Sequence, residues 1–288
     1  MNDEAGARND ELERLLFGIR PRLHRFCARM LGSAIDGEDI AQDAALKAIE
    51  AFPRQADIKN LEAWIFRIAR NTALDYLRRR KRESNIGLDD DADFADPYMD
   101  TERGLQAAAS LRQFMRLPTA QRATVILVDV IGYSLDEVTD ILEWTLPAVK
   151  ASLHRGRERL RNFAEEPAMQ PLTGLPDEER RQLENYVARF NARDFDALRQ
   201  LLADDVRLHV RAERHVGAPV KHYYSRYERI FDVKLEPGVV EGRPVALAFR
   251  EGVLAYFIAL DWRGGWITTI LDFRYAPYVL ETVTAAQL

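Results

Sequence analysis

An acidic segment in the middle of the chain limits what the chain can fold into. Between Asp89 and Glu102 the sequence carries seven acidic residues and no basic residue. Such a composition is strongly solvated and buries little apolar surface, so this segment cannot belong to a packed core. The chain has 288 residues, which exceeds the roughly 100–200 residues of one ordinary domain. We therefore expect several compact units, with an acidic linker at 84–104.

The residues before this linker show helical periodicity and little strand-like alternation. Ile40, Ala44 and Ala48 form an apolar stripe in a helix predicted over 37–52, which Pro53 ends. A second helix is predicted to start at the N-cap Asn60 and to end in a basic run, where cations suit the helix dipole. These patterns predict an all-α unit at 10–83.

The residues after the linker predict a helix-turn-helix. Pro118 opens a helix that Gly132 ends, Ser134 is a candidate N-cap for a short helix over 135–142, and another helix follows over 146–163. In a helix-turn-helix the second helix enters the major groove, and its first turns meet base edges. We therefore expect a second all-α unit at 105–163.

Basic residues are concentrated in two stretches, although the net charge of the chain is −5. Residues 60–82 contain seven basic and two acidic residues, and residues 143–163 contain five basic and two acidic residues. Either stretch alone is most simply a solvated helix face. Two basic helices in separate units, one of them in a helix-turn-helix, favour binding to double-stranded DNA. Arg155 and Arg157 are expected to contact phosphates, which gives affinity without sequence information.

Three ordered segments resemble the extracytoplasmic-function (group IV, sigma-70 family) RNA polymerase sigma factors. They are DGEDIAQDAALKAIEAF over 36–52, NLEAWIFRIARNTALDYLRRRKR over 60–82, and the helix-turn-helix segment over 117–161. The resemblance covers about residues 10–163. At the turn of the helix-turn-helix the family usually has Gly-Thr or Gly-Met, whereas this chain has Glu143 and Trp144. Glu143 therefore adopts a positive φ, or the first helix runs one residue further.

The resemblance implies a role for each segment. The first segment faces core RNA polymerase, the second reads and melts the minus-ten element, and the third reads the minus-thirty-five element of promoter DNA. Trp64 has a competing interpretation as a core residue, because it lies beside the apolar stripe of its helix. The residues implied are Asp39, Gln42 and Asp43 for polymerase; Trp64, Arg67, Arg70, Asn71, Arg78 and Arg79 for minus ten; and Thr145, Leu146, Ala148, Lys150, Ser152, Arg155 and Arg157 for minus thirty-five.

Beyond a Pro- and Gly-containing linker at 164–176, strand patterns dominate. Helices followed by a curved antiparallel sheet give an α+β domain at 177–288. The stretch NARDFDALRQLLADDVRLHV and the later GRPVALAFREG resemble the SnoaL-like members of the nuclear-transport-factor-like cone fold. The predicted helices span 177–192 and 196–203, the latter closed by Asp204 and Asp205, and the predicted strands span 206–211, 245–249, 253–260 and 266–273, with a hairpin turn at 263–265.

A cone of this kind often encloses a pocket. His209, Arg211, Tyr256 and Asp272 lie on predicted strands and are candidates to line it, where a His–Asp pair could act as acid and base. The simpler interpretation places His209 and Arg211 on a solvent face, because they alternate with apolar residues. We therefore predict no catalytic site. The resemblance implies that this domain contacts the sigma domains and regulates them in cis.

Other classes of site receive no support from the sequence. The single cysteine, Cys27, excludes an intrachain disulfide and a multi-cysteine metal site, and we expect neither a metal nor a cofactor. No apolar run approaches the roughly 20 residues that cross a bilayer. The N-terminus lacks the pattern of a secretory signal, so we expect a cytoplasmic protein that does not bind membranes.

Together these patterns predict a multi-domain sigma factor, with two all-α sigma domains followed by an α+β SnoaL-like domain. We expect it to bind core RNA polymerase and to direct promoter-specific transcription initiation. One alternative is a cone-domain ligand sensor or enzyme fused to a DNA-binding module. Another is an ordinary helix-turn-helix regulator that works without polymerase, and the segment at 36–52 argues against it because such a regulator has no need of it.

Overall fold

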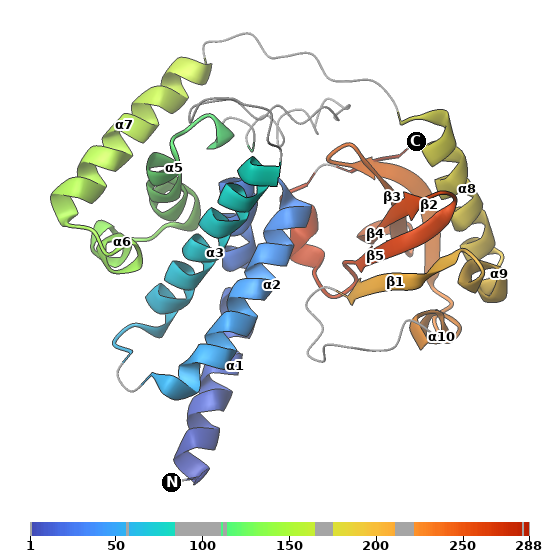
Figure 1. The fold of residues 1–288 in the computed structure, drawn as a ribbon, viewed down its shortest axis with the longest axis horizontal. Coiled ribbons are helices and arrows are strands. Elements are labelled where there is room, and N and C mark those ends of the chain that lie inside the picture. The colour runs from blue at the N-terminus through green and yellow to red at the C-terminus, as the bar shows by residue number, and fades with distance from the viewer. Residues whose placement is uncertain are drawn as a thin grey trace. The chain divides into compact units, whose positions relative to one another are not determined.

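The described residues form one helical unit and one α+β unit (Figure 1). The structure is a computed structural model, and it describes residues 2–55, 58–83, 111, 114–164, 175–210, 222–283 and 285–287. The helical unit contains the elements α1 to α7, and the α+β unit contains the elements from α8 to β6. None of the described helices is long and apolar enough to cross a membrane.

The first half of the helical unit consists of three helices, α1 (Asn2–Leu31), α2 (Ala34–Ala51) and α3 (Leu61–Glu83), with a short 3₁₀ turn, η1 (Phe52–Arg54), after α2. Helix α2 starts three residues before the predicted position, because the Ser33 side chain accepts a hydrogen bond from the backbone N–H of Asp36 and caps it there. Asn60 caps α3 in the same way through the N–H of Ala63, as predicted.

The second half contains α5 (Thr119–Val125), η2 (Ile126–Ile131), α6 (Leu135–Leu142) and α7 (Leu146–Ala164). Gly132 ends η2 with a φ of 88°, as expected for a glycine C-cap. Ser134 and Glu137 form a reciprocal capping box at the start of α6. The predicted helix-turn-helix is therefore confirmed as α6 and α7. One detail differs, because η2 is a π-helix and not a continuation of α5 in α geometry.

The two halves of the helical unit share one apolar core. The Phe66 ring on α3 lies 5.2 Å from the Tyr133 ring, which precedes α6, and 5.7 Å from the Phe26 ring on α1. Arg122 of α5 is buried and donates to the carbonyls of Met30, Phe114, Met115 and Leu117 at 2.7–2.9 Å. Burial lowers the pKa of Arg122 to about 10, which leaves its side chain charged at neutral pH. Its contact with Met30 joins α5 to the end of α1.

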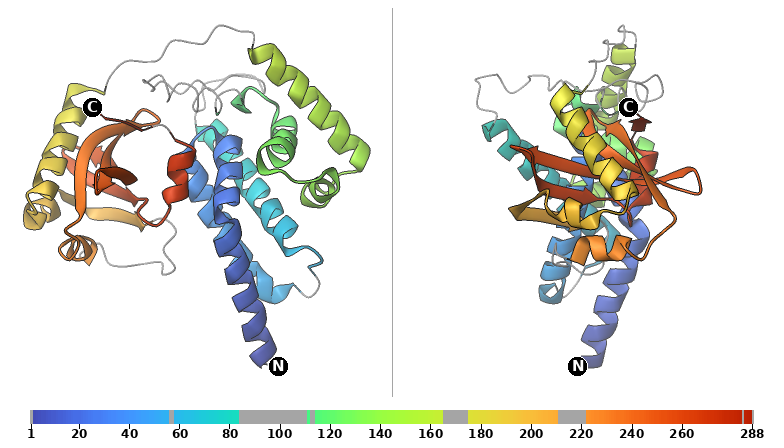
Figure 2. Two further views of the ribbon diagram at one scale, coloured as in Figure 1. Left: turned by 180° about the vertical axis from the view of Figure 1, so that it is seen from behind. Right: turned by 90° about the vertical axis from the view of Figure 1, so that its right-hand side faces the viewer.

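The α+β unit is built on a six-stranded sheet in the order β1-β5-β4-β3-β2-β6. Helix α8 covers one face of the sheet, and Leu183, Tyr186 and Phe190 of α8 share a core with Leu235 and Ile270 (Figure 2). The elements are α8 (Asp177–Asn191), α9 (Phe195–Arg199), β1 (Leu202–Val210), α10 (Tyr223–Tyr227), β2 (Val233–Val240), β3 (Arg243–Arg250), β4 (Val253–Arg263), β5 (Trp266–Asp272), η4 (Pro277–Glu281) and β6 (Ala285–Gln287).

The sheet differs from the sequence-based prediction in three ways. It is mixed, because β1 pairs with β5 in parallel while the other pairs are antiparallel. Strand β1 already begins at Leu202, so Asp204 and Asp205 lie in the strand and do not close a helix, and α9 ends at Arg199. Strand β2 and helix α10 were not predicted. The predicted hairpin is present, and both of its turn glycines have positive φ, 57° and 86°.

The buried Arg122 supports a stability prediction. We expect Arg122→Met to lower the free energy of unfolding of the helical unit by about 3 kcal/mol, because buried carbonyls lose a charged donor. Urea denaturation followed by circular dichroism measures this loss. Arg159→Met removes an exposed cation from α7 and should change the free energy of unfolding by less than about 0.5 kcal/mol. Equal midpoints for the two variants would show that the buried guanidinium contributes no stability.

Candidate nucleic-acid interface

Helix α2 presents an outer face of mixed acidic and apolar character. Asp39 and Gln42 are half-buried on this face, and Asp43 is exposed. Leu46 and Ile49 follow at helical spacing and are 38% and 44% exposed. Neighbouring exposed apolar side chains on one helix face can form the centre of a surface that binds another protein, with polar and charged residues at its rim. The residues predicted to face polymerase therefore lie together on one accessible helix face.

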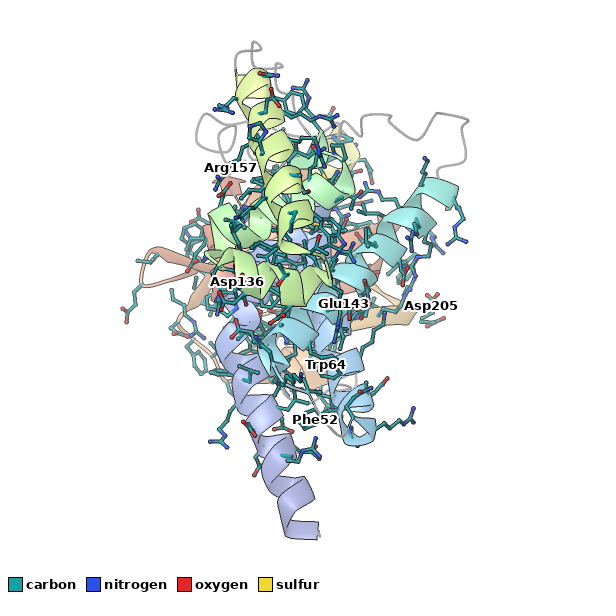
Figure 3. The ribbon with its side chains drawn as sticks, turned by 90° about the vertical axis from the view of Figure 1, so that its left-hand side faces the viewer. Phe52, Trp64, Asp136, Glu143, Arg157 and Asp205 are labelled. Carbon is teal, nitrogen blue, oxygen red and sulfur yellow. The ribbon has the colours of Figure 1, made fainter. Side chains whose placement is uncertain are left out.

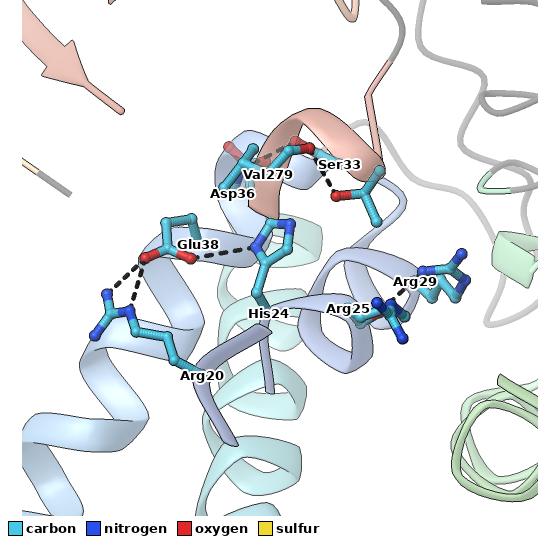
Figure 4. A network of polar contacts seen from close by, with 9 residues as sticks. Arg20, His24, Arg25, Arg29, Ser33, Asp36, Glu38 and Val279 are labelled. Atoms are coloured by element: carbon cyan, nitrogen blue, oxygen red, sulfur yellow. Dashed lines mark hydrogen bonds and ion pairs between the residues drawn. The ribbon is translucent and has the colours of Figure 1, made fainter. Parts of the chain in front are cut away.

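The inner face of α2 is fixed by a buried ion pair (Figure 4). Glu38 is fully buried and accepts from the Arg20 Nε at 3.2 Å, and its other oxygen lies 3.3 Å from the His24 Nδ1. Burial alone would raise the pKa of Glu38, but the contacts with His24 and Arg20 hold that pKa below its ordinary value. A Cβ at Gly37 would lie 2.5 Å from the Ala28 backbone, so α1 and α2 touch closely there. These contacts set the rotation of α2.

The C-terminal half of α3 carries an exposed basic surface. Asn71, Arg78 and Arg79 are exposed, and Arg70 donates to the Asn71 side chain at 3.3 Å. Arg78 forms an exposed ion pair with Asp75 at 3.2 Å. This arrangement can follow a DNA backbone by charge while its polar side chains meet unstacked bases.

Trp64 lies in the core. It is 8% exposed, and its ring centroid is 6.2 Å from that of Phe52 (Figure 3). A base cannot stack on a ring that is covered in this way. The structure therefore supports the packing interpretation, and we remove Trp64 from the residues proposed to contact DNA.

The N-terminal half of α3 contacts the ends of α6. Arg67 forms an ion pair with Glu143, and the Arg70 guanidinium carbon lies 5.8 Å from the Trp144 ring centroid. At the other end of α6, the Tyr133 hydroxyl donates to Glu62 of α3. Two of the arginines predicted to read the minus-ten element are thus engaged by the helix-turn-helix in this structure.

Helix α7 exposes most of the predicted groove-reading residues. Thr145 caps the helix through the N–H of Ala148, while Lys150 and Arg155 are exposed. Leu146 is half-buried and Ala148 is exposed, so both lie on the accessible first turn. The helix therefore presents short side chains at its start and cations further along, as a major-groove helix requires.

Two residues of α7 behave differently from the prediction. Ser152 is 3% exposed and its hydroxyl accepts from the Thr124 hydroxyl at 3.1 Å, so it faces α5 and cannot meet a base. Arg157 makes a two-pronged ion pair with Asp129, with the Nε 3.0 Å from Oδ2, and this hydrogen bond raises the pKa of Arg157. Arg155 is the better candidate for a phosphate contact.

A groove of about 690 Å³ beside α7 is lined by Leu135, Lys150, Leu153, His154, Arg157, Leu160 and Arg161.

The residues predicted to line a pocket in the α+β unit include two, Tyr256 and Asp272, that belong to a buried polar cluster. Asp272 is fully buried and accepts from the hydroxyls of Tyr223 and Tyr227, each at 2.9 Å, and from the Nε of Arg274 at 2.8 Å. Tyr256 joins it through the Tyr227 hydroxyl at 3.1 Å. Burial raises the pKa of Tyr256 to about 12, so this hydroxyl stays protonated at neutral pH. The cluster is held together by internal hydrogen bonds.

The predicted His–Asp pair is not formed. In the β1–β5 register His209 is opposite Leu271 and Val210 is opposite Asp272, so His209 and Asp272 point to opposite faces of the sheet. His209 is exposed, and Arg211 lies outside the described residues. The sequence-based reasoning missed Tyr223, Tyr227 and Arg274. The run of tyrosines at 223, 224 and 227 was the available signal, since helical spacing puts the first and last on one face.

Comparison with known families matches both halves of the helical unit in order. Residues 18–83 match the family Sigma-70 region 2, and residues 111–160 match Sigma-70, region 4. The chain is 30% identical over 158 residues to the ECF RNA polymerase sigma factor SigW of Bacillus subtilis, with 49% of this chain and 82% of SigW covered. The chain belongs to the ECF sigma factors.

Other ECF sigma factors are similar over a smaller share of their own length. The chain is 32% identical over 150 residues to SigE of Mycolicibacterium smegmatis, covering 49% of this chain and 57% of SigE. It is 31% identical over 210 residues to SigG of Mycobacterium tuberculosis, covering 63% of this chain and 56% of SigG. The chain thus spans little more than half the length of these two relatives.

Solved structures of sigma factors are also similar. The M. tuberculosis ECF sigma factor SigJ has a TM-score of 0.36 and 20% identity, and the match covers 88% of this chain and 93% of SigJ. RpoE from Bartonella quintana, solved with the anti-sigma factor NepR, has a TM-score of 0.43 and 23% identity, with 54% and 97% covered. In this chain the expected order of two helical sigma domains followed by an α+β domain is confirmed.

The buried cluster gives a prediction for the α+β unit. We expect Asp272→Asn to lower the free energy of unfolding of this unit by about 3–5 kcal/mol, because Arg274 is left as an unpaired buried charge. Thermal denaturation of the full chain, followed by tyrosine and tryptophan fluorescence, measures the change. Asp261→Asn, at an exposed position of β4, is the matched control. If both variants unfold like the parent chain, the cluster does not stabilise the unit.

Proposed function

We propose that the chain is a sigma subunit that binds core RNA polymerase and directs promoter-specific transcription initiation. The observation that carries the proposal is the position of α2, α3 and α7 in the two matched sigma regions. Apart from the buried Trp64 and Ser152, the predicted contact residues on these helices are exposed or half-buried, while the inner faces of the helices are packed. The proposed boundaries are 10–83 for sigma domain 2, 84–104 for an acidic linker, 105–163 for sigma domain 4, 164–176 for a second linker and 177–288 for a regulatory domain.

The roles of the contact residues follow from their chemistry. Asp39, Gln42 and Asp43 offer oxygen and amide groups to basic or polar groups of polymerase. The arginines of α3 and α7 attract phosphates, whereas the first turn of α7 distinguishes bases in the major groove. The proposed minus-ten residues are Arg67, Arg70, Asn71, Arg78 and Arg79, and the proposed minus-thirty-five residues are Thr145, Leu146, Ala148, Lys150, Arg155 and Arg157.

The α+β domain is proposed to regulate the sigma domains in cis and to have no catalytic activity. Two observations support a non-catalytic role. The carboxylate of Asp272 already accepts hydrogen bonds from Tyr223, Tyr227 and Arg274, and His209 lies on the opposite face of the sheet. An acid–base pair needs both groups within reach of one substrate.

Run-off transcription with purified core polymerase tests the proposal. The template is a pool of promoter fragments from the source genome, and the full chain is compared with a chain truncated after Phe163. We expect promoter-dependent transcripts from both proteins, in different amounts if the α+β domain regulates in cis. No transcript from either protein, with another sigma factor active on its own template, would contradict the proposed function.

The outer face of α2 can be tested by charge reversal. Asp39→Arg with Asp43→Arg should weaken association with core polymerase by about tenfold or more, because like charges then oppose each other at the interface. Fluorescence anisotropy of labelled chain titrated with core polymerase gives the dissociation constant. Glu11→Arg with Glu13→Arg makes the same charge change on exposed α1 positions. An equal effect of both double variants would exclude a specific contact at α2.

The contributions of Arg155 and Arg157 to DNA affinity can be distinguished by how the affinity of each variant depends on salt. Arg155→Ala should reduce the slope of log affinity against log salt by about 1, as expected for one lost phosphate contact. Arg157→Ala should change the slope less, because Asp129 already holds this guanidinium. The measurement uses holoenzyme and a duplex recovered from the run-off assay. An unchanged slope for Arg155→Ala would rule out its phosphate contact.

A further inference from the structure

Glu143 has an unusual backbone conformation at the turn between α6 and α7. Its φ is 56° and its ψ is 41°, in the left-handed region that disfavours residues with a Cβ. The sequence left two alternatives at this turn, and the structure shows the positive φ. A side chain kept at a strained position points to a function of that side chain.

The Glu143 side chain acts on the minus-ten helix. It is 65% exposed, yet its carboxylate forms an ion pair with Arg67. Its charge also reaches Arg70. Burial and repulsion from Arg78 lower the pKa of Arg70, and Glu143 counteracts this lowering. One carboxylate therefore compensates two cations of α3.

Trp144 covers the second of these cations. Its half-buried ring stands 5.8 Å from the Arg70 guanidinium carbon, within the range of a cation–π contact. The two residues together present a carboxylate and a flat aromatic ring to two neighbouring arginines. A nucleotide presents the same pair of features, a phosphate and a base that stacks.

We propose that Glu143 and Trp144 form an intramolecular clasp that occupies Arg67 and Arg70 until single-stranded promoter DNA displaces it. The inference rests on the proposed function, because it takes both arginines to be DNA contacts. The Glu143 carboxylate occupies the place of a DNA phosphate at Arg67, and the Trp144 indole occupies the place of an unstacked base at Arg70. DNA must therefore compete with the turn of the helix-turn-helix for these two side chains, which lowers the affinity of the free chain for single strands.

The strength of an exposed ion pair and a cation–π contact sets the size of the effect. Their loss should tighten binding of single-stranded DNA by about threefold to tenfold. Glu143→Gly is the most informative variant, because it removes the carboxylate and also places glycine at the left-handed position. It should therefore fold at least as well as the parent chain. Trp144→Ala removes the ring alone.

The test uses the full chain without polymerase. The probe is a fluorescein-labelled single-stranded DNA of mixed sequence and about 15 nucleotides, titrated by anisotropy at about 50 mM salt. Each variant is also measured in the Arg67→Ala or Arg70→Ala background, which completes two double-mutant cycles. We expect Glu143→Gly to tighten binding in the parent chain and to have a clearly smaller effect once Arg67 is absent, because only the longer-range attraction to Arg70 then remains. Trp144→Ala should depend on Arg70 in the same way.

The matched control separates the clasp from general charge. Asp140→Asn removes the same charge from an exposed position of α6, and it should leave the affinity unchanged within twofold. If Glu143→Gly tightened DNA binding equally in the parent chain and in the Arg67→Ala background, the clasp would be contradicted. The removal of one negative charge would then explain the tighter binding. No gain in the parent chain, or no binding by any variant, would overturn it as well.

The outcome is distinguishable from a failure of the proposed function. The anisotropy cycles need neither polymerase nor a known promoter, whereas the run-off assay needs both. If the chain shows the coupling in the anisotropy cycles but gives no transcript, the result supports the clasp and contradicts the sigma function. If the chain directs transcription but shows no coupling, the result contradicts only the clasp and supports the sigma function.

Discussion

The edge-to-face contacts of Phe66 with Phe26 and Tyr133 help to determine how the helical unit is arranged. These rings come from α1, α3 and the residue before α6, so they bring three segments far apart in sequence into one core. Aromatic pairs of this kind favour one relative orientation, because edge-to-face packing is directional. With α3 held in this way, Glu62, Arg67 and Arg70 face the ends of α6. The positions of the charged side chains at the surface thus follow from the uncharged interior.

Charge counts along the sequence describe this surface only in part. The basic stretches at 60–82 and 143–163 suggest a row of cations available to phosphate. In the structure Arg67 is paired with Glu143, Arg78 with Asp75 and Arg157 with Asp129. Under the proposed function, DNA would have to replace these partners before it gains from the arginines, so each contact would contribute less affinity than a free cation would. A binding surface with internal partners gains selectivity for ligands that can compete with them.

Local chemistry determined what could be predicted. The caps at Asn60 and Ser134, the glycine stop at 132 and the hairpin glycines act on neighbouring backbone, so sequence reveals them. Strand β2 was missed because Pro237 and Gly238 lie inside it and normally argue against a strand. The burial of Trp64 could be inferred from the apolar stripe beside it, whereas the burial of Ser152 and the tyrosine cluster around Asp272 depend on partner elements that the sequence does not place. Contacts between distant segments account for most of what the sequence could not show.

The π-helical turn η2 has a consequence for the whole helix-turn-helix. Six residues, Ile126–Ile131, accommodate a wider turn than an α-helix would use. Each residue of an α-helix advances the chain by about 100° around the axis, and each residue of the wider π-helical turn advances it by less, so the number of residues in η2 sets the angular position of the segments after it. Shortening η2 by one residue would rotate Tyr133, α6 and the turn at Glu143 away from α3. The number of residues in η2 therefore sets the orientation of α6 relative to α3, the helix that it contacts.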